Sequence, residues 1–282
     1  MRLPDLAELH DPDHLFLRGH DGDEFHCPSP RSFTRRMYRE RFDAVLRGVD
    51  RCRAAIGKPP QEISILDIGC AQGNYSLTLA ELGYRVVAMD LKLSFLRYLR
   101  LKYERGAVHC INASLEAPPF RSGFDIVLLG EVIEHVAHPD RLLATLRELL
   151  TPGGWLVLTT PNGDRFHTGL PTLSQIQDHN ALESKQFKPD ADGHLFLLTR
   201  DELRAETAKA GLDRIEHQYF STPWVTGRLK FRVLTRFLPL AISSGLDRAF
   251  LKTNVLARRF AEGQMIVAQR PKTSPEPASI RE

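Results

Sequence analysis

From residue 63 onward, short apolar segments alternate with segments of helical periodicity. Strands are predicted at residues 63–68, 85–89, 107–111, 125–129 and 155–160, with two later strands at 214–219 and 265–268. Between residues 139 and 150, Leu142, Leu143 and Leu146 recur at the spacing of one helix face. Strands alternating with helices predict an α/β fold, a doubly wound Rossmann-like sheet that is mostly parallel and has helices on both faces.

The ends of the chain follow a different pattern. Residues 1–58 are interpreted as an N-terminal helical segment that caps a substrate cleft, because residues 32–55 have amphipathic spacing. Residues 59–270 form the main domain, with a lid-like irregular insertion at 161–198. The tail, 271–282, is predicted to be disordered. An acidic cluster near the start is interpreted as a solvated loop; it contains His20, Asp21, Asp23, His26 and Cys27.

Charge is distributed unevenly along the 282 residues. Residues 224–260 hold eight basic residues and one acid, a net charge of +7, which leaves −4 for the rest of a chain with +3 overall. The large apolar side chains among these basic residues fit an anionic membrane surface. They also fit a helix pair on the domain edge, which we favour because apolar and basic positions do not separate onto two faces. Nucleic acid is an unfavoured partner, because the body of the protein is acidic.

The sequence also bears on location. The longest nearly apolar run, residues 237–246, is too short and too interrupted to cross a bilayer. The first residues are acidic where a signal peptide has a basic start, and the four cysteines form no CxxC pair. We therefore expect a cytoplasmic protein with reduced cysteines, able to associate with a membrane surface.

A glycine turn carries the strongest chemical signal. It runs from Ile65 to Asn74, after a buried strand and before a helix, and Gly69 and Gly73 let a ligand approach the backbone closely. Asp67 at the strand end would repel a dinucleotide pyrophosphate, so a ligand with a positive end fits better than NAD. The turn lacks the GK[ST] sequence of a nucleoside triphosphate site.

Two further positions fit a nucleoside. Asp90 ends the second predicted strand, about 20 residues after the turn, where an acid can accept bonds from both ribose hydroxyls. Asn112 and Ala113 follow the third strand, where an adenine edge would lie.

With these residues in order, the chain resembles the class I S-adenosylmethionine-dependent methyltransferases. The resemblance covers residues 63–162 through the motifs LDIGCAQG, VVAMD, FDIVLLGEVIEHV and LTPGGWLVLTTPN. It implies that S-adenosyl-L-methionine is the cofactor, with its methionine end, ribose and adenine held in that order by Asp67, Gly69, Ala71, Gly73, Asp90, Asn112 and Ala113. Ala71 replaces a common glycine and Asn112 a common aspartate; an asparagine carbonyl can still accept from the adenine amine.

A second constellation follows the fourth strand. One helical turn there would place Glu131, Glu134 and His135 together, and we add His194 from a later segment. Two carboxylates and two imidazoles fit a divalent ion such as magnesium, manganese or zinc. The segment resembles the metal-dependent branch that includes small-RNA 2′-O-methyltransferases and ubiquinone-pathway O-methyltransferases. Alternatively, these residues only shape the cleft, and His135 or His194, with Glu131, serves as the catalytic acid–base group.

These patterns lead to one preferred function. We expect an O-methyltransferase that acts on a hydroxyl of a small molecule, a sugar or glycan, or a lipid-linked intermediate. An RNA 2′-O-methyltransferase is the alternative within the same chemistry. An NAD-dependent oxidoreductase and a non-catalytic cofactor-binding protein are alternatives of other classes.

Overall fold

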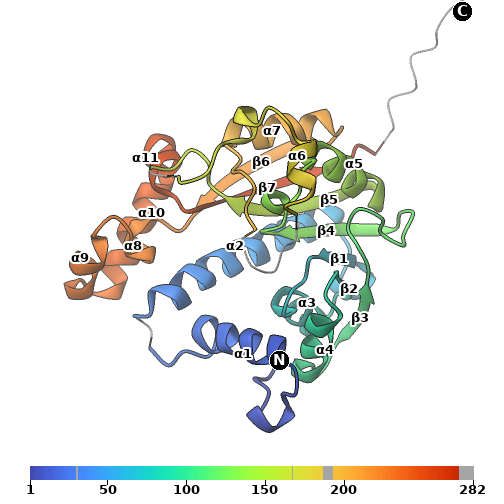
Figure 1. Ribbon diagram of the computed structural model, residues 1–282, viewed down its shortest axis with the longest axis horizontal. Coiled ribbons are helices and arrows are strands. Elements are labelled where there is room, and N and C mark those ends of the chain that lie inside the picture. Colours follow the sequence, from blue (N-terminus) through green and yellow to red (C-terminus); the bar gives the residue numbers. More distant parts are fainter. Residues whose placement is uncertain (30, 167, 187–192, 273–282) are drawn as a thin grey trace, which may run out of the picture.

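A seven-stranded sheet forms the centre of the computed structural model, which describes residues 1–29, 31–166, 168–186 and 193–272 (Figure 1). The strand order is β3-β2-β1-β4-β5-β7-β6. The strands are β1 (Ser64–Ile68), β2 (Arg85–Asp90), β3 (Ala107–Asn112), β4 (Phe124–Gly130), β5 (Leu150–Pro161), β6 (Asp213–Phe220) and β7 (Gly263–Gln269). The first five are parallel, and β7 pairs antiparallel with both β5 and β6. The predicted mostly parallel sheet is confirmed.

Helices cover both faces of this sheet. The longer ones are α1 (Pro12–Glu24), α2 (Phe33–Ile56), α3 (Asn74–Glu81), α4 (Leu93–Lys102), α5 (Pro139–Leu149), α7 (Arg200–Lys209) and α10 (Leu240–Lys252). Shorter ones are α6 (Asn180–Glu183), α8 (Pro223–Thr226), α9 (Phe231–Phe237) and α11 (Asn254–Phe260). Helices α5 and α7 pack into the hydrophobic core of one face, and α2 and α3 into that of the other.

The two cores explain why the strands are nearly continuous in apolar residues. Successive side chains of a strand point to opposite faces. In β1, Ile65 therefore joins the core under α2 and α3, whereas its neighbour Leu66 joins the core under α5. Because both faces of the sheet are buried, its strands do not need to alternate apolar and polar residues.

Capping residues set the ends of several helices. Ser32 accepts a hydrogen bond from Arg35 N at the start of α2, and Gly57 ends that helix with a left-handed φ of 76°. Thr199 and Glu202 form a capping box at the start of α7. Along α5, the predicted apolar stripe is buried at Leu142 and its partners.

Two local predictions are wrong. The acidic cluster is not a solvated loop, because it belongs largely to α1, which packs on α4 and buries Asp21 to 1% exposure. The strand predicted at residues 155–160 begins earlier, because residues 151–154, whose Pro-Gly-Gly sequence is typical of a turn, lie within β5. Gly153 donates to Arg270 O and Arg270 donates to Gly154 O, so pairing with the end of the chain extends the strand.

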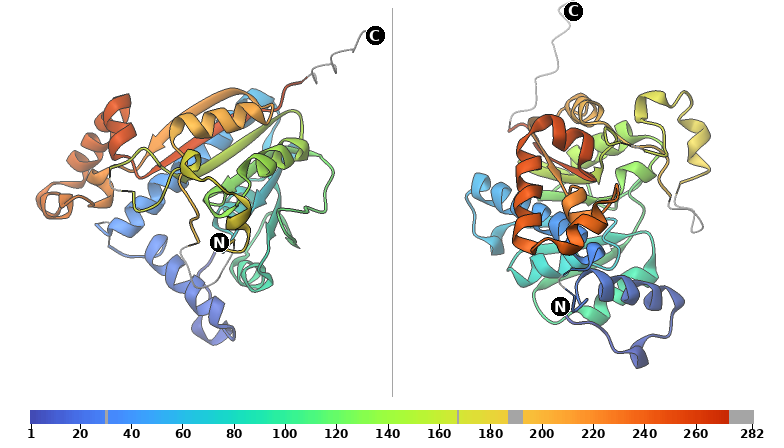
Figure 2. Two further views of the ribbon diagram at one scale, coloured as in Figure 1. Left: turned by 45° about the horizontal axis from the view of Figure 1, so that its top comes forward. Right: turned by 90° about the vertical axis from the view of Figure 1, so that its left-hand side faces the viewer.

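The basic segment folds as the short helices α8 to α11 at the edge of the sheet next to β6 (Figure 2). The segment thus packs at the domain edge as four helices, where the sequence suggests a helix pair. Its one acid, Asp247, is buried and accepts hydrogen bonds from Thr222. In the part of the chain that the structure describes, no helix is both long and apolar enough to cross a bilayer. The predicted tail, apart from residues 271 and 272, lies outside the described residues.

A buried ion pair ties α1 to the rest of the molecule. Lys102 Nζ lies 2.7 Å from Asp21 Oδ2, and both side chains are 1% exposed. Asp21 also accepts hydrogen bonds from Asn74 Nδ2 and Tyr98 Oη, each at 2.9 Å. Lys102 in turn donates to the carbonyl oxygen of Gln72 at 3.1 Å and to Asn74 Oδ1. The pair therefore links α1 and α4 to residues 72 and 74 of the glycine turn.

We predict that Lys102→Met destabilises the fold by about 3–5 kcal/mol, because it leaves the Asp21 carboxylate buried without its cation. The double variant Asp21→Asn/Lys102→Met removes both charges and should recover much of the loss. Urea denaturation measures both. The control is Lys58→Met, which breaks an exposed pair with Asp125 and should have a much smaller effect. Equal losses for Lys102→Met and Lys58→Met would contradict the prediction.

Candidate functional site

The carboxyl ends of the parallel strands meet at one edge of the sheet, which is where open α/β sheets bind ligands. Polar residues lie there at or just after successive strands. They are Asp67 in β1, Asp90 at the end of β2, Asn112 at the end of β3 and Glu131 directly after β4. The structure thus brings together residues that are up to 64 positions apart in the sequence.

The glycine turn between β1 and α3 has a tightly constrained backbone. Gly69, Ala71 and Gly73 all have positive φ values, of 66°, 46° and 75°. A Cβ atom at Gly73 would lie 2.2 Å from Leu99 Cδ1, so only glycine fits there without a shift of α4. Ala71 adopts the left-handed conformation at a cost of roughly 1–2 kcal/mol, which the glycine common at this position would avoid.

Asp90 holds this turn in place. Its Oδ2 accepts a hydrogen bond from Ala71 N at 2.9 Å, and its Oδ1 accepts from Lys92 N at 2.8 Å. Burial raises the pKa of the carboxyl group, and the backbone donors oppose that shift. Each carboxylate oxygen can accept a second bond, so binding of ribose hydroxyls is compatible with this role.

Asn112 and Ala113 are anchored to the same loop. Asn112 Nδ2 donates to the carbonyl oxygens of Asp90 and Leu91, at 2.9 and 2.7 Å. Ala113 N donates to Asp90 O at 3.2 Å. Because the amide nitrogen of Asn112 is engaged with the backbone, recognition of an adenine amine would fall to its carbonyl oxygen.

Asp67 lies at the bottom of the turn with 2% of its surface exposed. Its Oδ2 accepts a hydrogen bond of 2.5 Å from Ser76 Oγ in α3. Burial raises its pKa to about 7, and the nearby Asp90 contributes to the shift. Among the described residues, no lysine or arginine lies within ion-pair distance of Asp67. A buried carboxyl group without a cation is suited to a ligand that brings a positive charge.

A cluster of three potential metal ligands follows β4. Glu134 and His135 belong to a 3-10 helix, Ile133–His135, and His194 comes from the segment before α7. Glu134 Oε1 lies 4.0 Å from His135 Nε2 and 3.8 Å from His194 Nε2. A backbone hydrogen bond of 2.8 Å from Leu195 N to Glu134 O holds the two segments together. The structure therefore brings together three of the four residues considered for a metal.

The carboxyl group of Glu134 is unusual. It is fully buried; Thr160 Oγ1 donates to its Oε2 at 3.0 Å, whereas Oε1 has no hydrogen-bond partner among the described residues. Burial, followed by the negative charge of Glu131, raises its pKa well above the ordinary value. Burial also lowers the pKa of His135, which favours a neutral imidazole. A neutral imidazole can ligate a metal or accept a proton.

Glu131 lies outside this three-residue cluster. Its backbone is left-handed, with φ 56°, and its N–H donates to Thr159 O at 3.0 Å. The predicted helical turn is found only from Ile133 onward, so Glu131 is not on its face. Instead its Oε2 pairs with Arg41 of α2 at 3.0 Å. Burial and the Glu131 charge act in opposite directions on the pKa of Arg41, and the net shift is upward.

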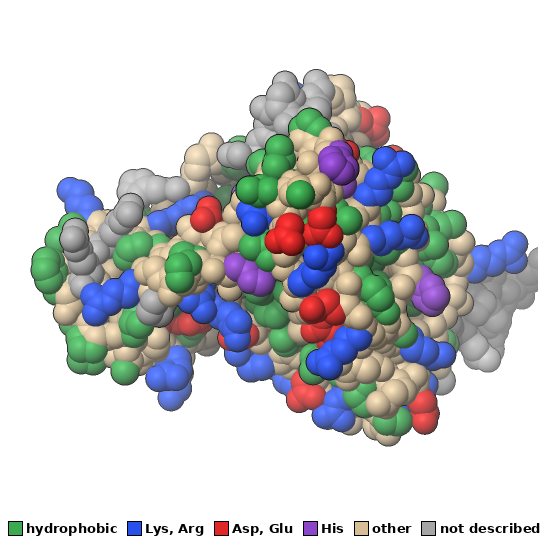
Figure 3. Space-filling model, turned by 90° about the horizontal axis from the view of Figure 1, so that it is seen from below, with side chains coloured by type: hydrophobic (Ala, Val, Ile, Leu, Met, Phe, Trp, Pro, Cys, Tyr) green, Lys and Arg blue, Asp and Glu red, His purple; other side chains and the backbone are tan. Residues whose placement is uncertain are grey.

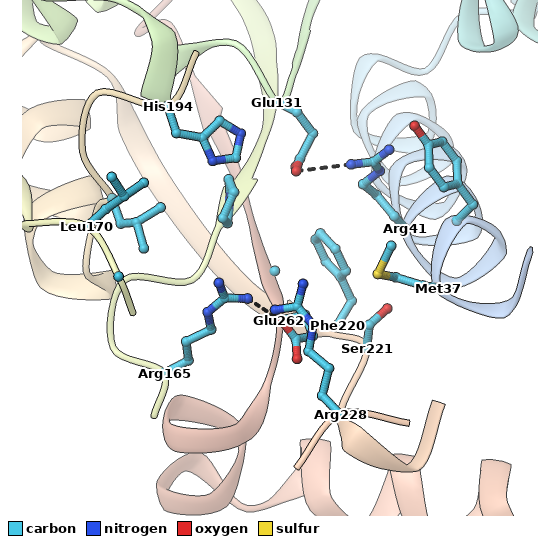
Figure 4. Close-up of a pocket in the computed structure, with 15 residues that line it drawn as sticks. Met37, Arg41, Glu131, Arg165, Leu170, His194, Phe220, Ser221, Arg228 and Glu262 are labelled. Atoms are coloured by element: carbon cyan, nitrogen blue, oxygen red, sulfur yellow. Dashed lines mark hydrogen bonds and ion pairs between the residues drawn. The ribbon is translucent and has the colours of Figure 1, made fainter. Parts of the chain in front are cut away.

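A cavity of about 250 Å³ adjoins the cluster (Figure 4). His194 and Glu131 lie at one end of it, and Arg165, Arg228 and Glu262 lie together at the other. Its wall combines α2, the insertion after β5, the end of β6 and the segment before β7. The lining residues are Met37, Tyr38, Arg41, Glu131, Pro161, Arg165, Gly169, Leu170, His194, Leu197, Phe220, Ser221, Arg228, Glu262 and Gly263.

Sequence reasoning found Glu131 and His194, but not the other charged residues of this cavity, Arg41, Arg165, Arg228 and Glu262. Arg41 lies in the predicted cap helix, Arg165 in the predicted insertion and Arg228 in the basic segment. The sequence therefore pointed to the regions that contain these arginines, but not to the individual residues. Nothing in the sequence pointed to Glu262. These residues come from distant parts of the chain, and no motif connects them.

The sheet order, the glycine turn and the acid after β2 together define the fold of the class I methyltransferases. Residues 35–217, more than half of the chain, match the family described as "Methyltransferase domain". The chain belongs to this methyltransferase family.

Curated relatives and solved structures agree with this class. The chain is 33% identical over 163 residues to a ubiquinone biosynthesis O-methyltransferase of Cereibacter sphaeroides, covering 57% of this chain and 64% of the relative. It is 32% identical over 145 residues to the corresponding protein of a Caulobacter species, covering 48% and 52%. The chain thus spans less than two thirds of the length of these relatives.

Among solved structures, a phosphoethanolamine N-methyltransferase 2 of Haemonchus contortus, in complex with phosphomonomethylethanolamine and S-adenosylhomocysteine, is similar in fold. Its TM-score is 0.57 at 18% sequence identity, and the match covers 96% of this chain and 61% of that one. At this identity the similarity establishes the fold alone.

Proposed function

We propose that this protein is an S-adenosylmethionine-dependent O-methyltransferase that acts on a hydroxyl group of a small molecule. The proposal is carried by the carboxyl edge of the sheet, where Asp67 is buried beneath a glycine turn with no cation at ion-pair distance among the described residues, and by the Glu134, His135 and His194 cluster that follows β4. Methyl transfer from a sulfonium requires in-line positioning and deprotonation of the acceptor. The curated relatives, named as ubiquinone biosynthesis O-methyltransferases, support a small-molecule acceptor over RNA.

In this proposal the cofactor lies along the carboxyl edge of the sheet. Asp67 and the turn containing Gly69, Ala71 and Gly73 hold the methionine end. Asp90 holds the ribose, and Asn112 with Ala113 borders the adenine. Two features support this order. Asp67 is a buried acid that suits the cationic methionine end, and Asn112 has an anchored amide that suits the adenine base.

We predict that binding of S-adenosylhomocysteine weakens as the pH falls through 7. Its ammonium group requires ionised Asp67, whose pKa is about 7 in the ligand-free protein. Affinity is then fully present above pH 8 and is about tenfold lower at pH 6. Calorimetric titration at both pH values measures this.

The matched variant for this titration is Asp67→Asn, which should bind more weakly at pH 8 and lose the pH dependence. The control is Asp140→Asn on the exposed start of α5, which should keep it. If the affinity of Asp67→Asn depended on pH as strongly as that of the unchanged protein, Asp67 could not have the role assigned to it.

We also propose that Glu134, His135 and His194 can hold a divalent cation, with Glu131 nearby. The fit is supported by Glu134 Oε1, which has no hydrogen-bond partner among the described residues and lies within 4.0 Å of both Nε2 atoms. A carboxylate with two imidazoles suits magnesium poorly and manganese or zinc better. A bound cation would lower the pKa of an acceptor hydroxyl. Without a cation, His135 or His194 would take the hydroxyl proton, with Glu131 as an electrostatic partner.

We predict that manganese and zinc bind the chelator-treated protein with one equivalent, as measured by calorimetry without any substrate. His194→Ala should weaken this binding by more than about a hundredfold, because loss of a ligand exceeds the 10–100-fold effect of an outer partner. His138→Ala, which removes an imidazole paired with Glu183 outside the cluster, is the control. Equal binding by both variants would exclude this cluster as the metal site.

A membrane surface is a second partner that we propose, and the outer face of α9 supports it. Val233, Leu234 and Phe237 are 68%, 51% and 79% exposed there. The surrounding segment has a net charge of +7, and its one acid is buried. Figure 3 shows hydrophobic and basic side chains gathered at the left-hand end of the molecule, which α8 to α10 form. Apolar side chains among cations fit an anionic bilayer.

We predict that the protein sediments with vesicles containing phosphatidylglycerol and much less with vesicles of phosphatidylcholine alone. The double variant Val233→Glu/Phe237→Glu should lose at least about tenfold in partitioning, because two apolar side chains no longer enter the bilayer. Leu82→Glu changes a 55% exposed leucine far from α9 and is the control. Sedimentation that is indifferent to lipid charge and to both α9 substitutions would argue against membrane association.

A further inference from the structure

The cavity of Figure 4 has more cations than anions. Three guanidinium groups, of Arg41, Arg165 and Arg228, line it with two carboxylates, of Glu131 and Glu262. Counted over these five groups, the wall has one excess positive charge. Arg41 is neutralised by Glu131 at 3.0 Å, so the excess lies at the opposite end, with Arg165 and Arg228.

At that end, two arginines share one carboxylate oxygen. Arg165 Nη1 and Arg228 Nη1 both pair with Glu262 Oε2, Arg228 at 2.7 Å. Glu262 is fixed by its backbone, since its N–H donates to Ser221 O and its carbonyl accepts from Asn162 N. The two guanidinium groups are thus held side by side by a single negative charge, and they retain donors for a second anion.

Two further polar atoms of this cavity have no hydrogen-bond partner among the described residues. They are Arg165 Nε and Ser221 Oγ, and Ser221 is fully buried. Its backbone has a left-handed φ of 58°, an uncommon conformation for serine. Buried polar atoms are normally hydrogen-bonded. A ligand that accepts hydrogen bonds would satisfy both atoms.

We propose that this cavity binds the methyl acceptor through an oxyanion, either a carboxylate or a phosphate. Arg165, Arg228 and Ser221 hold the anion, and the acceptor hydroxyl lies toward His194 at the other end. The inference rests on the proposed function, because it assigns the substrate class of the same site. A guanidinium presents paired N–H donors that match an oxyanion, and partial burial strengthens each bond.

The size of the cavity limits the acceptor. A cavity of 150 Å³ is filled by benzene, so about 250 Å³ accommodates one substituted ring. A carboxylate at one side of such a ring and a hydroxyl at the other would span the two ends. If Arg165 and Arg228 served only to fix Glu262, neutral and anionic acceptors would bind equally well.

The test uses three probes that differ in charge. The probes are 3,4-dihydroxybenzoate, its uncharged methyl ester, and phenyl phosphate, which separates phosphate from carboxylate as the source of the anion. Each is titrated calorimetrically into the full chain, with and without S-adenosylhomocysteine. We expect at least one of the two anions to bind at least about tenfold more tightly than the ester, which corresponds to one charge-assisted hydrogen bond.

Variants with opposite expected effects on anion binding distinguish the loss of a contact from misfolding. Arg165→Met and Arg228→Met should each remove most of the preference for the anion and leave binding of the ester unchanged. Glu262→Gln should increase anion affinity, because it releases both guanidinium groups from their carboxylate, and a misfolded protein could not show this gain. Arg51→Met breaks an exposed pair with Glu216 outside the cavity and should change nothing.

The proposal is overturned if neither anion binds more tightly than the ester, or if anion binding persists in both arginine variants. Absence of S-adenosylhomocysteine binding would instead count against the proposed function. Anion binding measured without the cofactor is independent of that result. Methyl transfer to 3,4-dihydroxybenzoate that is lost in Arg228→Met through KM, with kcat retained, would further support a role in acceptor binding.

Discussion

The convergence of parallel strands at one edge of the sheet is the constraint on which the rest of this structure depends. It places Asp67, Asp90 and Asn112 in one small volume beneath a turn whose φ values are positive at three of five residues. Burial there raises the pKa of both carboxyl groups, so the edge resists further negative charge. Two buried carboxyl groups disfavour a pyrophosphate and favour a cationic ligand.

The cavity next to this edge has the opposite electrostatic character. Arg165 and Arg228 share the single carboxylate of Glu262, whereas Asp67 has no cation at ion-pair distance in the part of the chain that the structure describes. His194 of the Glu134, His135 and His194 cluster lines this cavity. A positively charged methyl donor would bind near Asp67, and a negatively charged acceptor would bind near Arg165 and Arg228. Each ligand would then lie next to groups of opposite charge, and the histidines would be available to accept a proton from the acceptor. This arrangement connects the proposed chemistry to the proposed acceptor class.

Segments outside the sheet complete both environments. Helix α1 reaches the glycine turn through the Asp21 and Lys102 pair, and α2 delivers Arg41 to Glu131. The edge helices contribute Arg228 to the cavity and expose an apolar, basic face on α9. The acceptor cavity and the proposed membrane surface therefore belong to one contiguous part of the molecule, which would suit an acceptor that is presented from a lipid phase.

The sequence by itself determined the sheet, its strands and the residues of the turn, because local periodicity and glycine spacing report directly on backbone geometry. It also identified Glu134, His135 and His194 as candidates, since their residue types reveal their chemistry. Only the tertiary structure decided that Glu131 turns away to Arg41, that Asp21 is buried, and that Arg165, Arg228 and Glu262 meet. Those outcomes depend on contacts between distant segments, which no local pattern encodes.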